Sequence, residues 1–164
     1  ARGFFPFAIA LTTTPIIALA PILILWFGTG LSSKIAITVL ICFFPILVNT
    51  IKGLKSIDSD ALDLFRSYSA TKWQIFTKLR FFHALPYLFS ALKISTSLAV
   101  VGAIVGEFVG SSEGIGYLIL VSSYHLNTTT MFAAIVLSAL AGLLFFGVIV
   151  LIESKVIFWE HKES

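Results

Sequence analysis

Long uncharged stretches dominate the chain and alternate with short segments that carry most of its charge. The uncharged stretches cover residues 3–33, 35–51, 94–106 and 114–152. A helix needs about 20 apolar residues to cross the ~30 Å hydrocarbon core of a bilayer, and the longest of these stretches exceed that length. The pattern therefore predicts an all-α, polytopic transmembrane helical bundle.

Four crossings and one short apolar helix are expected. The crossings are expected at residues 4–27, 34–49, 86–110 and 131–152, and the short helix at 116–123. Pro15, Pro21 and Pro45 should bend the first two crossings, because each proline removes one backbone hydrogen bond. Asn127 and the threonines after it supply cap residues for the last crossing.

The segment from residue 52 to residue 93 differs from the rest, because it holds seven of the eleven Lys and Arg residues. Its apolar residues recur at helical spacing in two runs, which are Ala61, Leu64, Phe65 and Tyr68, then Trp73, Phe76, Leu79 and Phe82. This spacing predicts two short amphipathic helices, at about 60–67 and 71–82, within a loop of residues 53–85 and with a break at Ser69. By these residues alone, the loop can lie on anionic membrane lipid or bind a partner protein.

The distribution of charge orients the predicted crossings. With four crossings, the basic loop, Arg2 and the C-terminal tail lie on one side of the membrane, and Lys34 lies alone on the other. The positive-inside rule then predicts a cytoplasmic loop and a cytoplasmic C-terminus, with Glu153 and Lys155 at the inner boundary of the last crossing.

The overall composition agrees with a membrane protein and excludes other classes. Hydrophobic residues make up 58% of the 164 residues and charged residues 12%, against about a quarter charged in soluble domains. The net charge is only +3, and no soluble domain is expected to carry a basic face, so a nucleic-acid partner is excluded.

The sequence offers no pattern for catalysis, a cofactor or a metal. Cys42 is the single cysteine, so no intrachain disulfide can form, and it is interpreted as a small core residue. His125 is interpreted as a polar residue at the membrane interface, because no second ligand lies at metal-binding spacing. The chain has no Gly-x4-Gly-Lys-Ser/Thr run, and its crossings lack the residue clusters of a membrane-embedded enzyme. We therefore expect a protein that is not an enzyme.

The third crossing and the turn after it carry the candidate pathway residues. Gly102, Gly106 and Gly110 lie four apart, so another helix can approach this face, either within the subunit or along a path shared with a second copy. Glu107 is an ionisable group in an apolar helix, and both a structural hydrogen bond and a gate function are open. The turn at residues 113–117 is expected in the outer gate region, because non-helical backbone at membrane depth needs shielding.

At the basic loop the chain resembles the membrane-spanning permease subunit of type I ABC importers. Asp63-Leu64-Phe65 stands where that family has Glu-Ala-Ala, Ser69 replaces its glycine, Leu79 replaces its isoleucine, Phe81-Phe82 replaces its first Leu-Pro, and Leu85-Pro86 keeps the second. Further segments follow in the order typical of the nitrate, sulfonate and taurine branch: residues 26–30, 43–50, 53–54, 106–108 and 114–119, then Glu153 and Trp159. The changes at Ser69 and Phe82 alter loop geometry, since Gly frees φ and Pro fixes it.

The resemblance implies one permease domain over residues 1–164, in a bacterial inner membrane. Because the sequence starts at Ala1 without a methionine, we expect one or two N-terminal helices to be missing. The implied partners are a cytoplasmic ABC ATPase dimer, a second permease subunit that is identical or related, an extracytoplasmic solute-binding protein and membrane lipid. ATP hydrolysis in the partner would drive alternating access for a small solute, in the nitrate, sulfonate, taurine or vitamin-precursor class.

The resemblance also implies which residues act. The residues of the ATPase-coupling loop are Asp63, Leu64, Phe65, Ser69, Ala70, Phe76 and Leu79. The residues of the gate or pathway are Gly106, Glu107, Gly114, Gly116 and Tyr117.

The sequence leaves two alternative functions to compare with the importer permease. The first is a membrane scaffold or assembly protein that does not transport and whose basic loop binds lipid. The second is a secondary transporter, which would show inverted repeats or several charged residues at mid-membrane, and the sequence shows neither.

Overall fold

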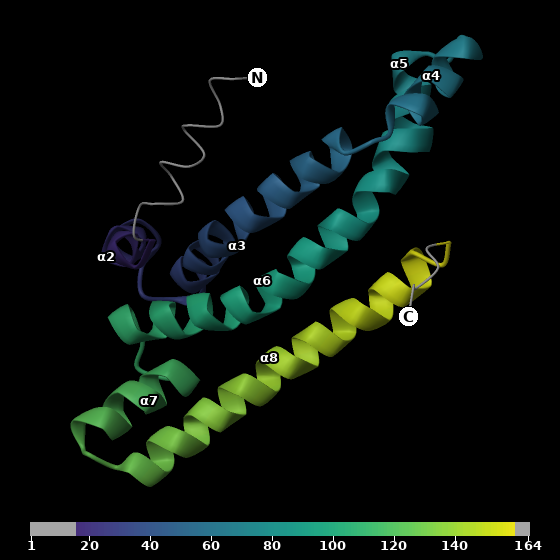
Figure 1. Ribbon diagram of the computed structural model, residues 1–164. Helices are drawn as coiled ribbons and strands as arrows, with labels where there is room; N and C mark the ends of the chain where they lie inside the picture. Colours follow the sequence, from purple (N-terminus) through teal and green to yellow (C-terminus); the bar gives the residue numbers. More distant parts are fainter. Residues whose placement is uncertain (1–15, 160–164) are drawn as a thin grey trace. The chain divides into compact units, whose positions relative to one another are not determined.

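The computed structural model describes residues 16–159, and every regular element among them is a helix. In chain order these are α2 (Ile16–Phe27), α3 (Leu31–Lys55), α4 (Ser59–Ser67), α5 (Lys72–Ile75), the π-helical η1 (Phe76–Arg80), α6 (Phe81–Gly110), α7 (Ile115–Tyr124) and α8 (Thr128–Val156). Figure 1 shows this order in colour. The predicted all-α class is confirmed.

Within residues 16–159, three helical stretches are long and apolar enough to cross a membrane. They are Leu31–Lys55, Lys72–Gly110 and Thr128–Val156. The short apolar helix expected at 116–123 is α7, and Pro21 and Pro45 lie inside α2 and α3 as predicted. The part of the first expected crossing before residue 16, with Pro15 and Arg2, lies outside the described residues.

The boundary expected between the second loop helix and the third crossing is wrong. α5, η1 and α6 follow one another without a gap, so Lys72–Gly110 is one helical stretch of 39 residues. Pro86 lies inside α6 and does not begin it. A proline removes one hydrogen bond from a helix without forcing it to end, and packing of the neighbouring turns can offset that loss.

The described residues form two compact units. Unit 1 contains residues 16–44 and Ser95–Phe146, and unit 2 contains Pro45–Ile94 and residues 147–159. The three long helices α3, α6 and α8 each contribute to both units. Unit 1 has a small core of Ala20, Leu23 and Ile37, whereas the core of unit 2 is Leu85, Phe89 and Ile157.

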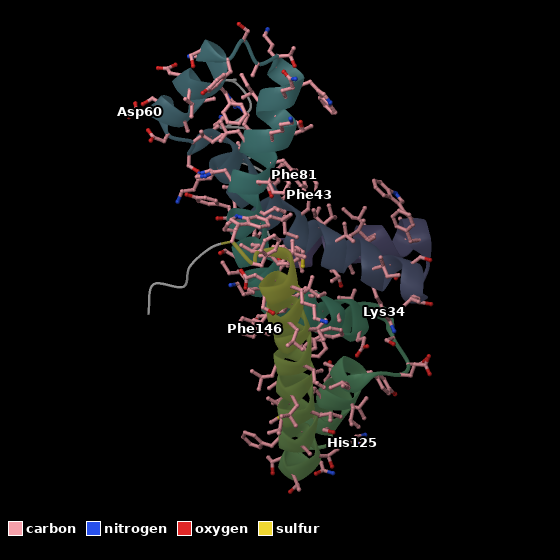
Figure 2. All side chains as sticks on the ribbon, turned by 90° about the vertical axis from the view of Figure 1, so that its right-hand side faces the viewer. Lys34, Phe43, Asp60, Phe81, His125 and Phe146 are labelled. Atoms are coloured by element: carbon pink, nitrogen blue, oxygen red, sulfur yellow. The ribbon has the colours of Figure 1, made fainter. Side chains whose placement is uncertain are left out.

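Large apolar side chains remain uncovered on many helices, most clearly on α8. The most apolar window of α8 has none of its residues buried, and Leu144 is 72% exposed. Figure 2 shows these side chains projecting from the helix around Phe146. Apolar surface on this scale is unusual for a soluble monomer and is what a helix in contact with lipid or with another subunit presents.

Candidate functional site

The candidate coupling loop in unit 2 starts with α4, a helix that has no core of its own. Asp58 caps its N-terminus, where its side chain accepts a 3.3 Å hydrogen bond from Asp60 N–H. No residue of α4 is buried, and Leu64 is 56% exposed. Arg66 pairs with Asp63 at 3.0 Å, but both side chains are about two-thirds exposed, so this ion pair adds little stability. The apolar face of α4 is therefore open for a partner.

The predicted break at Ser69 is present and has a defined geometry. Ser69 has φ of +54°, the left-handed region that normally favours glycine. Ser69 N–H donates to Arg66 O at 2.8 Å and Ala70 N–H donates to Phe65 O at 3.0 Å. These two bonds form a Schellman motif, which ends α4 and satisfies its last carbonyls. Ser69 thus adopts a left-handed backbone conformation that glycine adopts without strain.

The second loop helix begins at a complete capping box. Thr71 Oγ1 accepts from Gln74 N–H, and the Gln74 side chain accepts from Thr71 N–H at 2.8 Å. Trp73 and Phe76 stack at a centroid distance of 5.9 Å, and Trp73 is 71% exposed. This turn therefore presents an aromatic surface beside α4.

A cleft of about 540 Å³ lies among these loop elements. Its lining residues are Leu62, Arg66, Ala70, Lys72, Ile75, Phe76 and Arg80. Of the predicted coupling residues it includes Ala70 and Phe76, while Asp63 and Leu64 are exposed and Phe65 and Leu79 are half-buried. The sequence interpretation missed the three basic residues of the lining, although their clustering in the loop was a usable signal.

The candidate gate in unit 1 is built around the carboxylate of Glu107. Glu107 extends from α6 and accepts a hydrogen bond from Gly116 N–H, in the first turn of α7. A negative charge at a helix N-terminus is stabilised by the helix dipole. Glu107 therefore acts as the cap of α7, whose own N-cap residue, Gly114, has no side chain to cap with.

The two glycines of this turn are required by the close approach of Glu107. Gly114 has φ of +113°, and a Cβ added there would clash with Glu107 Cδ. A Cβ on Gly116 would lie 2.9 Å from the carbonyl oxygen of Ile104. The predicted gate residues Glu107, Gly114 and Gly116 are thus brought together, and Tyr117 follows them, half-buried, on α7.

Lys34 of α3 contacts the turn that follows the C-terminus of α6. Its Nζ donates to Ser111 Oγ at 2.9 Å, and Ser111 Oγ in turn donates to the carbonyl of Glu113 at 2.5 Å. A cation is favourable at a helix C-terminus for the same reason that an anion is at an N-terminus. The sequence interpretation treated Lys34 only as a marker of orientation and missed this contact.

The glycine stripe of α6 serves packing within the subunit. A Cβ on Gly102 would lie 2.9 Å from Thr38 Cα, and one on Gly106 would lie 3.2 Å from Lys34 Cα, both on α3. A Cβ on Gly110 would lie 3.1 Å from Ile24 Cδ1 of α2. Of the two alternatives, the structure supports close helix packing for this face.

A mostly apolar cavity of about 330 Å³ opens beside Glu107 in unit 1. Its lining residues are Ala99, Val100, Ala103, Ile104, Glu107, Ile115, Ser138, Ala141 and Phe145. The polar groups of this lining are the Glu107 carboxylate and the Ser138 hydroxyl, which donates to Ile135 O at 2.7 Å. The contribution of α8 was not predicted, because apolar and small residues repeat all along that helix.

Glu153 does more than mark a membrane boundary, which corrects the sequence interpretation. Lys93 Nζ donates to both of its carboxylate oxygens at 2.9 Å, and the two side chains are 28% and 22% exposed. His125, in contrast, is exposed at the C-terminal end of α7 (Figure 2).

Comparison with known proteins identifies the family. Residues 1–158 match the family model of the binding-protein-dependent transport system inner membrane component. The formylaminopyrimidine transport permease protein ThiX of Halalkalibacterium halodurans is 42% identical over 99% of this chain and 65% of its own length. The riboflavin transport system permease protein RibX of Chloroflexus aurantiacus is 36% identical over 97% of this chain and 59% of its own length.

A third relative is the putative aliphatic sulfonates transport permease protein SsuC of Bacillus subtilis, 33% identical over 93% of this chain and 55% of its own length. The chain therefore spans between 55% and 65% of the length of these three relatives. The family expected from the loop and its surroundings is confirmed. With a match that covers nearly every residue, the chain belongs to the binding-protein-dependent transport system inner membrane components.

Proposed function

We propose that this chain is the main part of the permease subunit of an ABC importer, which moves a small solute across the membrane by alternating access. The observation that carries the proposal is the uninterrupted helical stretch Lys72–Gly110. It begins at the loop cleft and ends at the turn that Glu107 caps, so the two candidate sites lie at the two ends of one continuous helical stretch. A movement imposed at the loop would thus reach the gate.

The proposed partner at the loop is a cytoplasmic ATPase dimer, which hydrolyses ATP while the permease does not. Leu64 and Trp73 offer exposed apolar surface, and the cleft of the same loop carries three basic groups in its lining, which suits a protein partner. A second copy of the permease would cover the uncovered apolar surface of α8, and a solute-binding protein would dock at the external turn.

The proposed gate is the contact of Glu107 with Gly114 and Gly116. A carboxylate that is held by one backbone N–H, that of Gly116, can release α7 when α6 shifts, since the hydrogen bond is local and directional. Residues 111–114 would form the external face of this gate.

We place the solute among uncharged or cationic heterocycles, in keeping with the names of the relatives ThiX and RibX. The apolar walls of the cavity beside Glu107 favour a planar ring. The carboxylate would disfavour a sulfonate or nitrate through like-charge repulsion.

The test uses the full-length permease with the ATPase and the solute-binding protein of its own organism. Proteoliposomes are expected to take up a pyrimidine or flavin solute only when two conditions are met. The ATPase and ATP must be inside the vesicles, and the solute-binding protein must be outside. If no ATPase copurifies with the permease in mild detergent, the importer proposal fails and a lipid-binding scaffold becomes the better explanation.

A further inference from the structure

The ion pair between Lys93 and Glu153 stands out in unit 2 because it joins two helices that can cross a membrane. Lys93 lies on α6 and Glu153 on α8, and the ammonium group is 2.9 Å from both carboxylate oxygens. Two charges in such a setting are costly to desolvate unless they are well paired. Apolar residues of similar size would pack there without this desolvation free energy. Stability alone therefore does not explain why the position holds an ion pair.

The surroundings of the pair show what it holds together. Leu85 and Phe89 of α6 form a buried cluster with Ile157, which follows α8 directly. Phe82 and Trp159 make an edge-to-face contact with a centroid distance of 5.5 Å. These positions on α6 are spaced by three or four residues and continue to Lys93, so one face of α6 meets the end of α8.

Apolar contacts alone do not fix how far one helix is shifted along another. In lipid the tails are as apolar as leucine, so there is no strong hydrophobic penalty against a shift by one turn of about 5.4 Å. An ion pair with two equal contacts to one carboxylate has a single favourable position. Fixing register is the best-attested role of buried polar and ionic groups between helices.

We propose that Lys93 and Glu153 are positioning residues that fix the register of α8 along α6. The end of α8 then moves together with the part of α6 that lies in unit 2. The register itself needs no partner protein, whereas its consequence, that α8 takes part in the ATP-driven movement, rests on the proposed function.

The register is tested by disulfide cross-linking in membranes that contain the full-length permease alone. Leu85→Cys and Ile157→Cys are combined in a Cys42→Ala background. Each single reversal, Lys93→Glu or Glu153→Lys, is expected to lower the cross-linked fraction about tenfold, because it leaves two like charges facing each other. The swap of both residues should restore most of it. Equal cross-linking in the single reversals and the unmodified pair would overturn the proposal.

A neutral pair separates register from general stability. Lys93→Met with Glu153→Gln keeps the side-chain volumes, so the permease should fold and bind the ATPase normally. The solute transported per ATP hydrolysed is expected to fall by about threefold or more, as for coupled contacting residues. An unchanged ratio of solute transported to ATP hydrolysed would show that α8 need not follow α6. It would overturn the inference that α8 takes part in the ATP-driven movement. If the unmodified permease binds no ATPase, the proposed function fails while the cross-linking still decides the register.

Discussion

Ser69 holds a backbone conformation that suits glycine better than serine. Its φ of +54° costs an L-residue about 1 kcal/mol, although the two hydrogen bonds of the Schellman motif hold it in place. The cost is tolerated at the junction of α4 and α5, where a rigid turn sets the direction of both helices. The family's glycine would remove the strain and would also enlarge the freedom of the unfolded chain.

Replacing the strained serine should therefore have a measurable effect. Ser69→Gly is expected to leave α4 in place and to stabilise the protein by up to about 1 kcal/mol, seen as a higher Tm of the purified permease. The matched control is Ser67→Gly, which places glycine in the last turn of α4 and should destabilise it by up to about 1 kcal/mol. A lower Tm for both variants would contradict the strain at Ser69.

Glu107 combines a structural hydrogen bond with a charge in an apolar helix. Glu107→Gln keeps an oxygen that can accept from Gly116 N–H but removes the charge at the N-terminus of α7. The expected loss of stability is about 0.3–1 kcal/mol, so the complex should still assemble. If the charge serves the gate, ATP hydrolysis continues while solute uptake falls, which parallel assays of the two rates would show.

The control for this prediction removes the hydrogen bond as well. Glu107→Ala leaves Gly116 N–H without its acceptor and should lower Tm more than Glu107→Gln does. Normal uptake by Glu107→Gln, with normal stimulation by the binding protein, would restrict Glu107 to capping α7.

The loop helix α4 leaves its apolar face uncovered, and the proposed ATPase would bury it. Leu64→Asp is expected to release the ATPase, because a charge at the centre of an interface must be desolvated when the partner docks. The permease should remain folded, since Leu64 is 56% exposed and contributes little to the core. Copurification of the ATPase from detergent extracts measures the effect.

Ser59→Asp provides the matched control for the loop. It adds the same charge to α4, at its first turn, where an acidic residue agrees with the helix dipole. ATPase binding should survive this change. Binding that survives Leu64→Asp as well would remove α4 from the coupling interface.

Most of these elements could be predicted from local patterns in the sequence. The spacing of Leu64 and Phe65 predicts α4, and Asn127 caps α8 as expected, with its Oδ1 accepting from Thr130 N–H at 3.1 Å. The end of the second loop helix could not be predicted, because a proline such as Pro86 is compatible with both a helix start and a helix interior. Whether the helix ends there depends on packing that the local sequence does not encode.

The candidate sites were predicted less completely, for a different physical reason. Gly114 and Glu107 were identified because a carboxylate in an apolar helix and a glycine-rich turn are each unusual. Glu153 was placed at the inner membrane boundary, but its ion pair with Lys93 was not predicted, since their contact depends on which faces of α6 and α8 meet. Contacts between distant helices are set by the whole packing arrangement and are not visible in residue spacing.

For the whole molecule, the main prediction concerns its orientation in the membrane. The basic loop should face the cytoplasm and the turn after α6 should face outside. Ser112 is exposed in that turn, whereas Lys34 is half-buried, so Ser112 is the better position for labelling. In intact cells, Ser112→Cys in a Cys42→Ala background should react with an impermeant thiol reagent, and Lys72→Cys should not.

Permeabilised cells supply the control for orientation. Lys72 is exposed, so Lys72→Cys should become reactive once the reagent can enter. Labelling of Lys72→Cys but not of Ser112→Cys in intact cells would reverse the topology, and the proposed site of the ATPase would move with it.

The π-helical stretch Phe76–Arg80 is a position where related permeases can differ in length by one residue. The bond from Phe81 N–H to Phe76 O closes a turn that holds one residue more than an α-turn does. Loss of one residue here would convert the stretch into ordinary α-helix, while the capping box before it and the face of α6 after it would keep their own contacts. A one-residue gap at these positions in a related permease would therefore mark a change of helix type and not a missing part of the loop. Insertions and deletions elsewhere between Thr71 and Gly110 would instead shift the following residues around the helix axis by about 100° per residue.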